Sequence, residues 1–418
     1  MKRLLILGAG TAGTMMAHKM RRKLKVSEWD ITVIDKSEKH FYQPGLIFVP
    51  FKLYGYTGEK GNIKNTRDLL PKDVNFVSKA ITRLDPENNR VETADESFEY
   101  DWLILGLGCR IAPEEVPGLE AGYGKNVFYY YTMPSALDMQ KALEDFDGGK
   151  LVLNITEYPI KCPVAPIEFI CLADYFFHLK GIRHKVDLEL VTSAQGVFTK
   201  PVAGRMLGDM FKEKGIKVTP NFTVAEVRSD QGKIISHDGK EVQFDFLASI
   251  PPNVGAGIID EAGMGNGNGY ALTHPNTLKS QKYNNIYVIG DCTNVNTSKA
   301  GSVAHFQAGI VERNILREIE GKDPLPDFDG HSNCFIETGF KKAHLIDFNY
   351  KQEPIPGRFP LPTFGPFSLL KETRLNHMGK LFFRWFYWNM LLSDMVDMEM
   401  ILPTSMSYLG KDLSYVTK

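Results

Sequence analysis

The sequence predicts an α/β protein with parallel sheets, and three observations favour this class. The apolar runs Leu4–Leu7, Leu103–Leu105 and Ile286–Ile289 are each followed directly by a glycine, as buried parallel strands are where the chain turns. A further apolar run, Leu151–Ile155, lies in the middle of the chain. From residue 353 onward, prolines alternate with aromatic residues, which marks a change of organisation. We therefore expect two Rossmann-like domains followed by a C-terminal amphipathic helical region.

The length, charge and cysteine content limit what the chain does. At 418 residues it is too long for one hydrophobic core. Its net charge of −1 gives no overall field that would attract nucleic acid. The five cysteines are widely spaced and fit neither a zinc site nor a disulfide framework, so we expect no metal. The apolar run after Lys2 and Arg3 ends at Gly8, which is too short for a signal peptide, and we expect none.

The N-terminal apolar run leads into a glycine-rich turn of the form GxGxxG, made by Gly8, Gly10 and Gly13. Gly8 permits the tight turn, Gly10 lets a pyrophosphate approach the backbone, and Gly13 lets the following helix pack closely on the strand. The pyrophosphate would lie at the helix N-terminus, where unpaired N–H groups point toward it. The next strand, Asp30–Ile34, is followed by Asp35, an acid placed to bind a ribose hydroxyl. The turn is therefore expected to bind a dinucleotide.

Two later glycine elements extend this pattern. Gly106 and Gly108 follow the strand that ends at Leu105 and let the backbone lie against a dinucleotide. Gly290 and Asp291 follow the strand that ends at Ile289, where a carboxylate can hold the ribityl chain of a flavin. Three such elements in this order resemble the FAD-binding domain of the two-dinucleotide-domain flavoproteins, the glutathione-reductase-like class. The resemblance implies that FAD is the cofactor and that its site includes Gly8, Gly10, Thr11, Ala12, Gly13, Asp35, Lys36, Gln43, Ala80, Gly106, Gly108, Gly290, Asp291, Lys299 and Gly301.

The resemblance also implies a division of the chain into domains of the FAD- or NAD(P)-binding type. Residues 1–110 and 283–325 would form a discontinuous FAD-binding domain, 111–282 a second Rossmann-like domain, and 326–418 a separate C-terminal region. The second domain has no glycine-rich turn after its first strand. Pro159, Pro163 and Pro166 stand in that stretch and remove N–H donors, so we expect that NAD(P)H binding is lost.

Cys162 and Cys334 are the candidate redox pair. Cys162 follows a strand and precedes a helix, and a thiol near a helix N-terminus has a lowered pKa. Cys334 lies far along the chain; if both thiols converge on one face of a flavin, they form a pair able to pass two electrons. We expect the other cysteines, Cys109, Cys171 and Cys292, to be small buried hydrophobes.

Four segments resemble the sulfide:quinone oxidoreductases. Cys162 to Glu168 looks like the family's Cys-x-x-x-x-x-Glu element, and Cys334 with Gly339 is similar to its second cysteine segment. Lys299–Ala304 looks like its Lys-x-Gly turn, where a helix N-terminus faces the flavin, and Lys380–Phe383 resembles a segment that lines the quinone site. This chain departs from many members in two ways: it has no cysteine within residues 128–132, and a histidine frequent in the middle domain is missing.

The resemblance implies an activity and its site residues. Sulfide would attack a Cys162–Cys334 disulfide, or a sulfur-bridged form of it, and two electrons would pass through the flavin to a membrane quinone. Sulfane sulfur would leave as polysulfide or to a thiol acceptor. Glu168 is the candidate proton carrier for the quinone. The quinone site would include Phe335, Gly339, Lys380 and Phe383.

The C-terminal tail predicts attachment to one leaflet of a membrane. Residues 369–392 favour a basic, aromatic, amphipathic helix, with an apolar set formed by Leu375, Met378, Phe382, Trp385, Phe386 and Trp388. Lys380 and Arg384 interrupt the apolar stretch, so the helix is not expected to cross the membrane. A helix packed on its own domain or in a dimer interface is the alternative. We expect a peripheral protein on the cytoplasmic face of a membrane.

Other functions remain open at this point. A type II NADH:quinone dehydrogenase also combines FAD, a quinone and a membrane tail, but the missing second glycine turn and the paired cysteines argue against it. The flavoprotein subunit of a flavocytochrome c sulfide dehydrogenase would need a secretory signal. A flavin-bound redox sensor or scaffold that does not turn over is a third alternative. The sequence leaves open the oligomeric state, including a homo-oligomer, the quinone type, the sulfur-chain length and acceptor, covalent attachment of FAD, and the effect of the missing cysteine.

Overall fold

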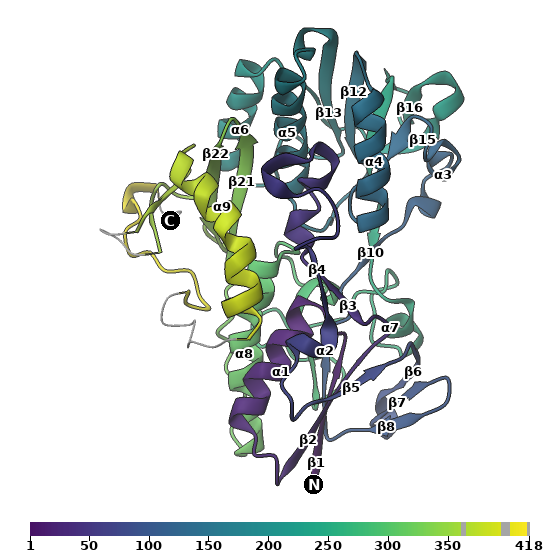
Figure 1. Ribbon diagram of the computed structural model, residues 1–418. Coiled ribbons are helices and arrows are strands. Elements are labelled where there is room, and N and C mark those ends of the chain that lie inside the picture. Colours follow the sequence, from purple (N-terminus) through teal and green to yellow (C-terminus); the bar gives the residue numbers. More distant parts are fainter. Residues whose placement is uncertain (361–364, 394–401, 416–418) are drawn as a thin grey trace.

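The computed structural model describes residues 1–360, 365–393 and 402–415. Its centre consists of two five-stranded sheets in which all neighbouring strands run parallel, one in the lower half of Figure 1 and one in the upper half. The predicted α/β class is therefore confirmed. The proposed domain boundaries stay a prediction.

The first sheet contains, in spatial order, β20 (Ile286–Val288), β9 (Trp102–Leu105), β1 (Lys2–Leu7), β2 (Trp29–Asp35) and β5 (Asn75–Ser78). Leu4–Leu7 in its middle strand are fully buried. Helices α1 (Thr11–Lys23) and α8 (Gly301–Ile319) lie side by side on one face of this sheet (Figure 1). A buried ion pair of 2.8 Å between Lys19 Nζ and Glu312 Oε2 joins them. The carboxyl ends of these strands therefore meet the N-termini of both helices.

Smaller elements surround the first sheet. They are the hairpin of β3 (Lys39–Phe41) and β4 (Ile63–Asn65), the antiparallel sheet of β6 (Ile81–Asp85), β7 (Arg90–Thr93) and β8 (Ser97–Glu99), the short helices α2 (Thr66–Leu69) and α7 (Gly257–Glu261), and the paired segments β10 (Arg110–Ile111) and β19 (Asn253–Val254).

The second sheet contains, in spatial order, β11 (Val127–Phe128), β18 (Phe246–Ile250), β12 (Gly149–Ile155), β13 (Val186–Thr192) and β14 (Lys217–Thr219). The accompanying helices are α3 (Leu119–Gly122), α4 (Met133–Asp145), α5 (Ala165–Leu179) and α6 (Pro201–Glu213). A three-stranded antiparallel sheet of β15 (Val224–Arg228), β16 (Lys233–Ser236) and β17 (Glu241–Gln243) completes this half.

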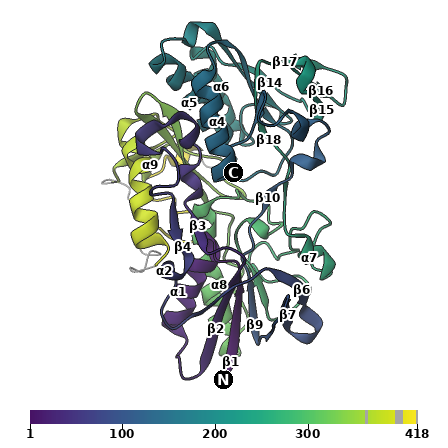
Figure 2. The same ribbon diagram turned by 45° about the vertical axis from the view of Figure 1, so that its right-hand side comes forward.

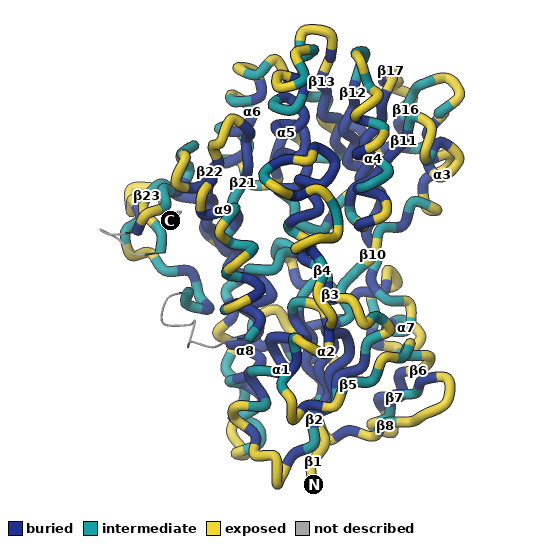
Figure 3. The backbone as a smooth tube through the Cα atoms, in the orientation of Figure 1, coloured by how far each residue is buried: buried dark blue, intermediate teal, exposed yellow. Residues whose placement is uncertain are grey.

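The C-terminal part forms a third unit beside the two sheets. A long hairpin of β21 (Ser332–Gly339) and β22 (Lys342–Phe348) lies between α5, which packs on β21, and α9 (Arg374–Phe386), which packs on β22. A π-helical turn, Tyr387–Leu391, continues α9. Figures 1 and 2 both show α9 along one side of the molecule. Figure 3 shows that both central sheets are buried, whereas exposed residues recur along α9.

The predicted helix over residues 369–392 begins later than expected. Residues Phe367–Leu369 form strand β24, which pairs with β23 (Gly357–Phe359). The helix begins at Arg374 because the Thr373 side chain accepts a hydrogen bond from Asn376 N and caps it. Apolar periodicity alone did not reveal this start. No helix within the described residues combines the length and apolar character that a membrane span requires.

Candidate functional site

A cavity of about 620 Å³ lies where the first sheet, α5, α8, β21 and the C-terminal helix meet. Its lining comes from segments as far apart as residues 9 and 402. The sequence-predicted residues that line it are Gly10, Thr11, Ala12, Asp35, Lys36, Gln43, Gly106, Gly108, Cys162, Glu168, Gly290, Asp291, Lys299, Gly301, Cys334, Phe335, Lys380 and Phe383. The fold thus brings nearly the whole predicted site into one space.

The glycine-rich turn has the geometry that a dinucleotide needs. A Cβ on Gly13 would lie 1.8 Å from the carbonyl oxygen of Gly8, and one on Gly8 would lie 2.4 Å from that of Gly106, so both glycines are required for close packing beneath the cavity. Gly10 lines the cavity, and a Cβ there would meet nothing within 4 Å. The open surface at Gly10, at the N-terminus of α1, is therefore free to receive a pyrophosphate, and the residues present fit FAD.

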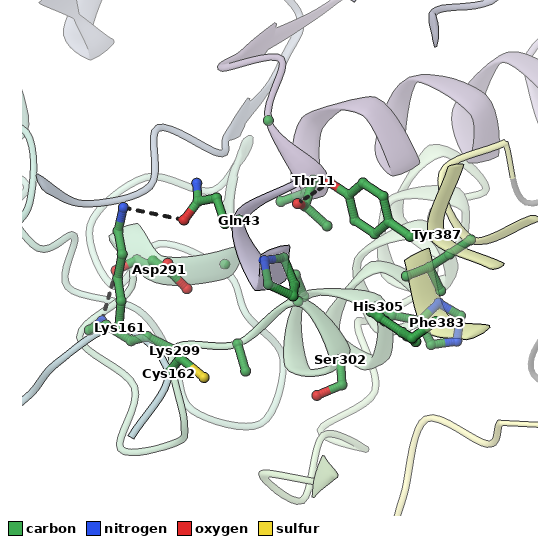
Figure 4. A pocket seen from close by; sticks show the side chains of 18 of the residues that line it. Thr11, Gln43, Lys161, Cys162, Asp291, Lys299, Ser302, His305, Phe383 and Tyr387 are labelled. Carbon is green, nitrogen blue, oxygen red and sulfur yellow. Dashed lines mark hydrogen bonds between the residues drawn. The ribbon is translucent and has the colours of Figure 1, made fainter. Parts of the chain in front are cut away.

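Acidic residues follow two strands at this end of the sheet. Asp35 ends β2, and its carboxylate accepts hydrogen bonds from Ala9 N at 2.7 Å and Ser37 N at 2.8 Å. Asp291 follows β20 and lines the cavity beside Lys299 (Figure 4). The Lys299 ammonium donates to the carbonyl oxygens of Asp291 at 2.7 Å and Thr293 at 2.9 Å. Lys299 thereby fixes the loop that presents the Asp291 carboxylate.

Besides Gly8 and Gly13, which pack beneath the cavity, two further predicted residues lie outside its lining. Ala80 is exposed on the loop after β5. Gly339 has a φ of +76° and packs against α5, where an added Cβ would lie 2.6 Å from Cβ of Tyr175. The structure therefore gives Gly339 a packing role between β21 and α5, and it does not bring Ala80 to the other site residues.

Both candidate redox cysteines line the cavity. Cys162 lies three residues before α5 with a φ of +49°, and its backbone N donates to the carbonyl oxygen of Lys299 at 2.7 Å, which joins its loop to the start of α8. Cys334 is buried on β21 next to Ser302 of α8. The same two charged residues act on both thiols: Glu168 raises the pKa of Cys162 and of Cys334, and Lys380 lowers it. All five cysteines are free thiols.

The expectation of a lowered pKa for Cys162 is wrong for the protein alone. Burial raises the pKa of its thiol to about 12, Glu168 adds to this rise, and Lys380 opposes it. Cys334 also has a raised pKa, again mainly through burial. The physical reason is desolvation, which exceeds the effect of a helix N-terminus three residues away.

Of the three remaining cysteines, two follow the expectation fully. Cys171 and Cys292 are buried, whereas Cys109 is only half-buried and lines the cavity. Burial and then Asp291 raise the pKa of the Cys109 thiol to about 12. Cys109 therefore lies at the Asp291 end of the cavity.

A buried ion pair stands beside the cysteines. Lys380 Nζ of α9 lies 2.7 Å from Glu168 Oε1 of α5, and their side chains are 9% and 1% exposed. The same Glu168 oxygen accepts from Glu337 N at 2.8 Å. Burial lowers the pKa of Lys380, but Glu168 and the two cysteines outweigh it, so the pKa lies above its usual value. The cavity thus holds a charged ammonium against two sulfur atoms.

Sequence reasoning missed a second buried pair behind the first. Glu337 Oε2 accepts from His377 Nδ1 at 2.8 Å, and Tyr54 OH donates to Glu337 Oε1 at 3.1 Å. Burial raises the pKa of Glu337, and His377 opposes the rise. Only the position of Glu337 three residues after Cys334 could have indicated it.

The aromatic residues of the tail divide differently from the expected pattern. Leu375, Met378, Phe382 and Trp385 are 51 to 62% exposed and form one face of α9. Trp388, which the sequence pattern grouped with this apolar set, is buried instead, and so is Tyr387. Tyr387 follows the cavity-lining residues Lys380 and Phe383 at helical spacing, and Trp388 is held inward by a hydrogen bond to Gly61, so these two side chains point into the protein. Figure 4 shows Tyr387 beside Thr11, with Phe383 nearby.

Comparisons with known proteins agree with this geometry. Residues 2–150 match the family model described as pyridine nucleotide-disulphide oxidoreductase. The chain is 27% identical over 397 residues to the mitochondrial sulfide:quinone oxidoreductase of Mus musculus, covering 93% of this chain and 86% of the relative. It is 24% identical over 345 residues to the type II NADH:quinone oxidoreductase of Staphylococcus aureus, covering 77% and 83%.

A solved structure gives the same relation at the level of the fold. The sulfide:quinone oxidoreductase from the hyperthermophilic bacterium Aquifex aeolicus superposes with a TM-score of 0.78 at 20% identity, over 100% of this chain and 99% of that chain. The predictions of an oxidoreductase and of FAD as its cofactor are thereby confirmed. The resemblance inferred from the motifs is confirmed as well: over nearly its whole length, this chain is similar to proteins named sulfide:quinone oxidoreductase.

Proposed function

We propose that this chain oxidises sulfide through Cys162 and Cys334 and passes two electrons to a membrane quinone. The observation that carries the proposal is the lining of one cavity by both cysteines, the glycine-rich turn and the Lys380–Glu168 pair. The relatives named sulfide:quinone oxidoreductase support it. FAD, when bound, supplies a two-electron carrier between the sulfur atoms and the quinone.

The sulfur chemistry follows from thiol–disulfide exchange. HS⁻ attacks one sulfur of an oxidised Cys162–Cys334 pair, the S–S bond breaks, and one cysteine becomes a persulfide while the other becomes a thiolate. The nearby Lys380 ammonium favours that thiolate electrostatically. The terminal sulfur then leaves to a second sulfide or a thiol. Summed over one turnover, HS⁻, quinone and one proton give sulfane sulfur and quinol.

The net proton must reach the quinone from the protein. Glu168 and Lys380 are ionisable side chains that line the same cavity as Phe335 and Phe383, the two aromatic rings of the expected quinone site. Lys380 can donate a hydrogen bond to a quinone oxygen, and Glu168 at 2.7 Å can return a proton to it. We assign these two residues to the quinone half-reaction.

We also propose that the exposed apolar face of α9 attaches the protein to one leaflet of a membrane. Leu375, Met378, Phe382 and Trp385 lie on this face, and Phe382 also lines the cavity. A quinone dissolved in the leaflet would thus reach the cavity beside the attached helix. A helix held in a dimer interface is the competing assignment of the same face.

The type II NADH:quinone dehydrogenase is the second candidate, supported by the relative from Staphylococcus aureus. One feature opposes it. Between the end of β12 at Ile155 and the start of α5 at Ala165, the chain contains Pro159 and Pro163 and no glycine. This connection offers no glycine-rich turn for a second dinucleotide.

The deciding experiment measures the two half-reactions of the purified protein. Anaerobic addition of sulfide should bleach the flavin absorbance, NADH should leave it unchanged, and a short-chain quinone should restore it repeatedly. Bleaching by NADH would establish the dehydrogenase instead. A single bleaching event without repeated quinone turnover would establish a redox sensor.

Cysteine variants test the assigned pair. Cys162→Ser and Cys334→Ser should each lower sulfide-dependent flavin reduction at least a hundred-fold while FAD stays bound, because neither variant can form the disulfide. Cys171→Ser, in the same helix neighbourhood but fully buried, is the matched control and should stay within a few-fold of the unaltered protein. Normal turnover in Cys334→Ser would refute the assignment.

A further inference from the structure

Three side chains close a ring of hydrogen bonds over the glycine-rich turn. The hydroxyls of Thr11 and Tyr387 lie 2.7 Å apart, as the dashed line in Figure 4 shows. Tyr387 OH also lies 2.7 Å from Nε2 of His40, and Nδ1 of His40 lies 2.9 Å from the carbonyl oxygen of Ala9. Ala9 and Thr11 belong to the turn itself, whereas Tyr387 comes from the C-terminal tail. The ring therefore joins the tail to the cofactor turn.

The chemistry of the groups fixes the direction of every bond in the ring. A carbonyl oxygen only accepts, so Nδ1 of His40 carries the hydrogen that it donates to Ala9. Burial lowers the pKa of His40 to about 4, so its imidazole is neutral at physiological pH and Nε2 is an acceptor. Tyr387 must then donate to His40, and Thr11 must donate to Tyr387. Each donor of the ring is matched to one acceptor.

Within the described residues, the other hydrogen bonds of Ala9 come from neighbouring strand and helix residues. Ala9 N donates to Asp35, and the Ala9 carbonyl oxygen also accepts from Thr14 Oγ1 at 3.0 Å. Gly10, the N-cap of α1, offers no side chain to satisfy the helix N-terminus. Both these local hydrogen bonds and the docked tail therefore stabilise the conformation in which α1 presents its free N–H groups to the cavity.

We propose that Tyr387 is a positioning residue that couples docking of the tail to binding of FAD at the glycine-rich turn. The inference rests on FAD as the cofactor and is independent of sulfide and quinone. The docked tail orders the turn and raises its affinity for FAD. By thermodynamic reciprocity, bound FAD tightens the docking of the tail by the same factor. The tail would then be fully docked only in the flavin-loaded protein.

The same π-helical turn provides a matched control. Trp388 follows Tyr387, is also buried, and donates from Nε1 to the carbonyl oxygen of Gly61 at 3.0 Å. This bond anchors the tail without contacting the glycine-rich turn, and Trp388 does not line the cavity. The Trp388 side chain also packs edge-on against His40, with ring centroids 5.5 Å apart, and phenylalanine keeps an aromatic ring at that place. Tyr387→Phe therefore removes the two hydrogen bonds that its hydroxyl makes in the ring, whereas Trp388→Phe removes one hydrogen bond of the docked tail outside the ring.

The test titrates FAD into the deflavinated full-length chain and follows flavin fluorescence. Tyr387→Phe should weaken FAD binding by about two- to ten-fold, a part of the free energy that its two buried hydrogen bonds contribute. Thr11→Val, which breaks the ring from the cofactor side, should weaken it at least as much. Trp388→Phe should leave the affinity within two-fold. The folded state of each variant is checked by circular dichroism.

A second readout follows the tail directly. FAD should slow tryptic cleavage after Arg384 in the unaltered protein, and it should slow it less in Tyr387→Phe and Thr11→Val. Unchanged FAD affinity in Tyr387→Phe, or an equal loss in Trp388→Phe, would overturn the coupling while leaving the proposed function intact. A chain that binds no FAD under any condition would refute the proposed function itself.

Discussion

At the scale of single residues, the Lys380–Glu168 pair makes a measurable contribution to stability. Both side chains are at least nine-tenths buried, so Lys380→Met leaves the Glu168 carboxylate in the interior without its counter-ion. We expect the free energy of unfolding to fall by about 3 to 5 kcal/mol, as when one partner of a buried pair is removed. Urea unfolding of the FAD-loaded protein measures this change.

A surface pair provides the control for this prediction. Lys342 lies 3.0 Å from Glu372, but their side chains are 47% and 28% exposed, so Lys342→Met should cost less than about 1 kcal/mol. The double variant Lys380→Met with Glu168→Leu should recover part of the loss because no buried charge remains. If Lys380→Met and Lys342→Met lower the free energy of unfolding equally, the Lys380–Glu168 pair contributes no more to stability than a surface pair.

The residues of the glycine-rich turn could be predicted from the sequence because their roles are local. Gly8, Gly10 and Gly13 act through backbone geometry within a few residues. The pKa of Cys162 and the position of Tyr387 could not be predicted in this way. Both depend on burial by segments far along the chain, and a sequence pattern around either residue contains no trace of that burial.

At the scale of elements, the exposed face of α9 is the feature to test for membrane binding. The side chains of Met378 and Phe382 are 62% and 55% exposed and lie one helical turn apart. Replacing both by Glu should lower co-sedimentation with anionic vesicles at least ten-fold, because two apolar contacts with the bilayer are lost and two negative charges are added. Reduction of the flavin by sulfide should persist.

An equally exposed residue elsewhere is the control for vesicle binding. Leu179 at the end of α5 is 61% exposed and lies outside α9, so Leu179→Glu should bind vesicles normally. If the α9 variant instead changes the oligomeric state and still binds vesicles, the face belongs to a dimer interface.

The amphipathic character of α9 could be predicted, but its inner side could not. Periodicity placed the exposed apolar residues correctly, yet it grouped Trp388 with them. Trp388 is instead held inward by a hydrogen bond to Gly61, which is 327 residues away and leaves no local pattern. Removing the whole tail after Pro366 would also remove Lys380 and Tyr387 from the cavity, so point variants separate membrane binding from catalysis more cleanly.

At the scale of the whole molecule, the strands and their order in the sequence were the predictable part. Apolar runs followed by glycines identify β1, β9 and β20 of the first sheet, and an apolar run identifies β12 of the second, because parallel strands are buried on both faces. The convergence of α5, β21 and α9 on one cavity was implied only by resemblance to a family. Contacts between residues more than a hundred positions apart leave no local pattern from which they could be derived.

Stability of the whole molecule should decrease on mild acidification. His40, His305 and His344 are buried, and burial lowers the pKa of each imidazole to about 4, against an ordinary value of 6.5. Above pH 6.5 these histidines are neutral in both the folded and the unfolded chain. As the pH falls from 6.5 toward 4, only the unfolded chain takes up the three protons, so the free energy of unfolding falls. Each histidine should contribute a loss of about 2 kcal/mol between pH 7 and pH 5.

Urea unfolding at pH 7 and pH 5 measures this loss, and a histidine variant assigns it. His344→Gln should reduce the difference between the two pH values by about a third, because it removes one of three similar groups and lies outside the cavity. His184→Gln, at an exposed position, is the matched control and should leave the difference unchanged. Most carboxylates stay ionised above pH 5, so their protonation lowers the free energy of unfolding only below pH 5 and does not contribute to this difference. A free energy of unfolding that is equal at pH 7 and pH 5 would show that the three imidazoles are solvated in the folded protein.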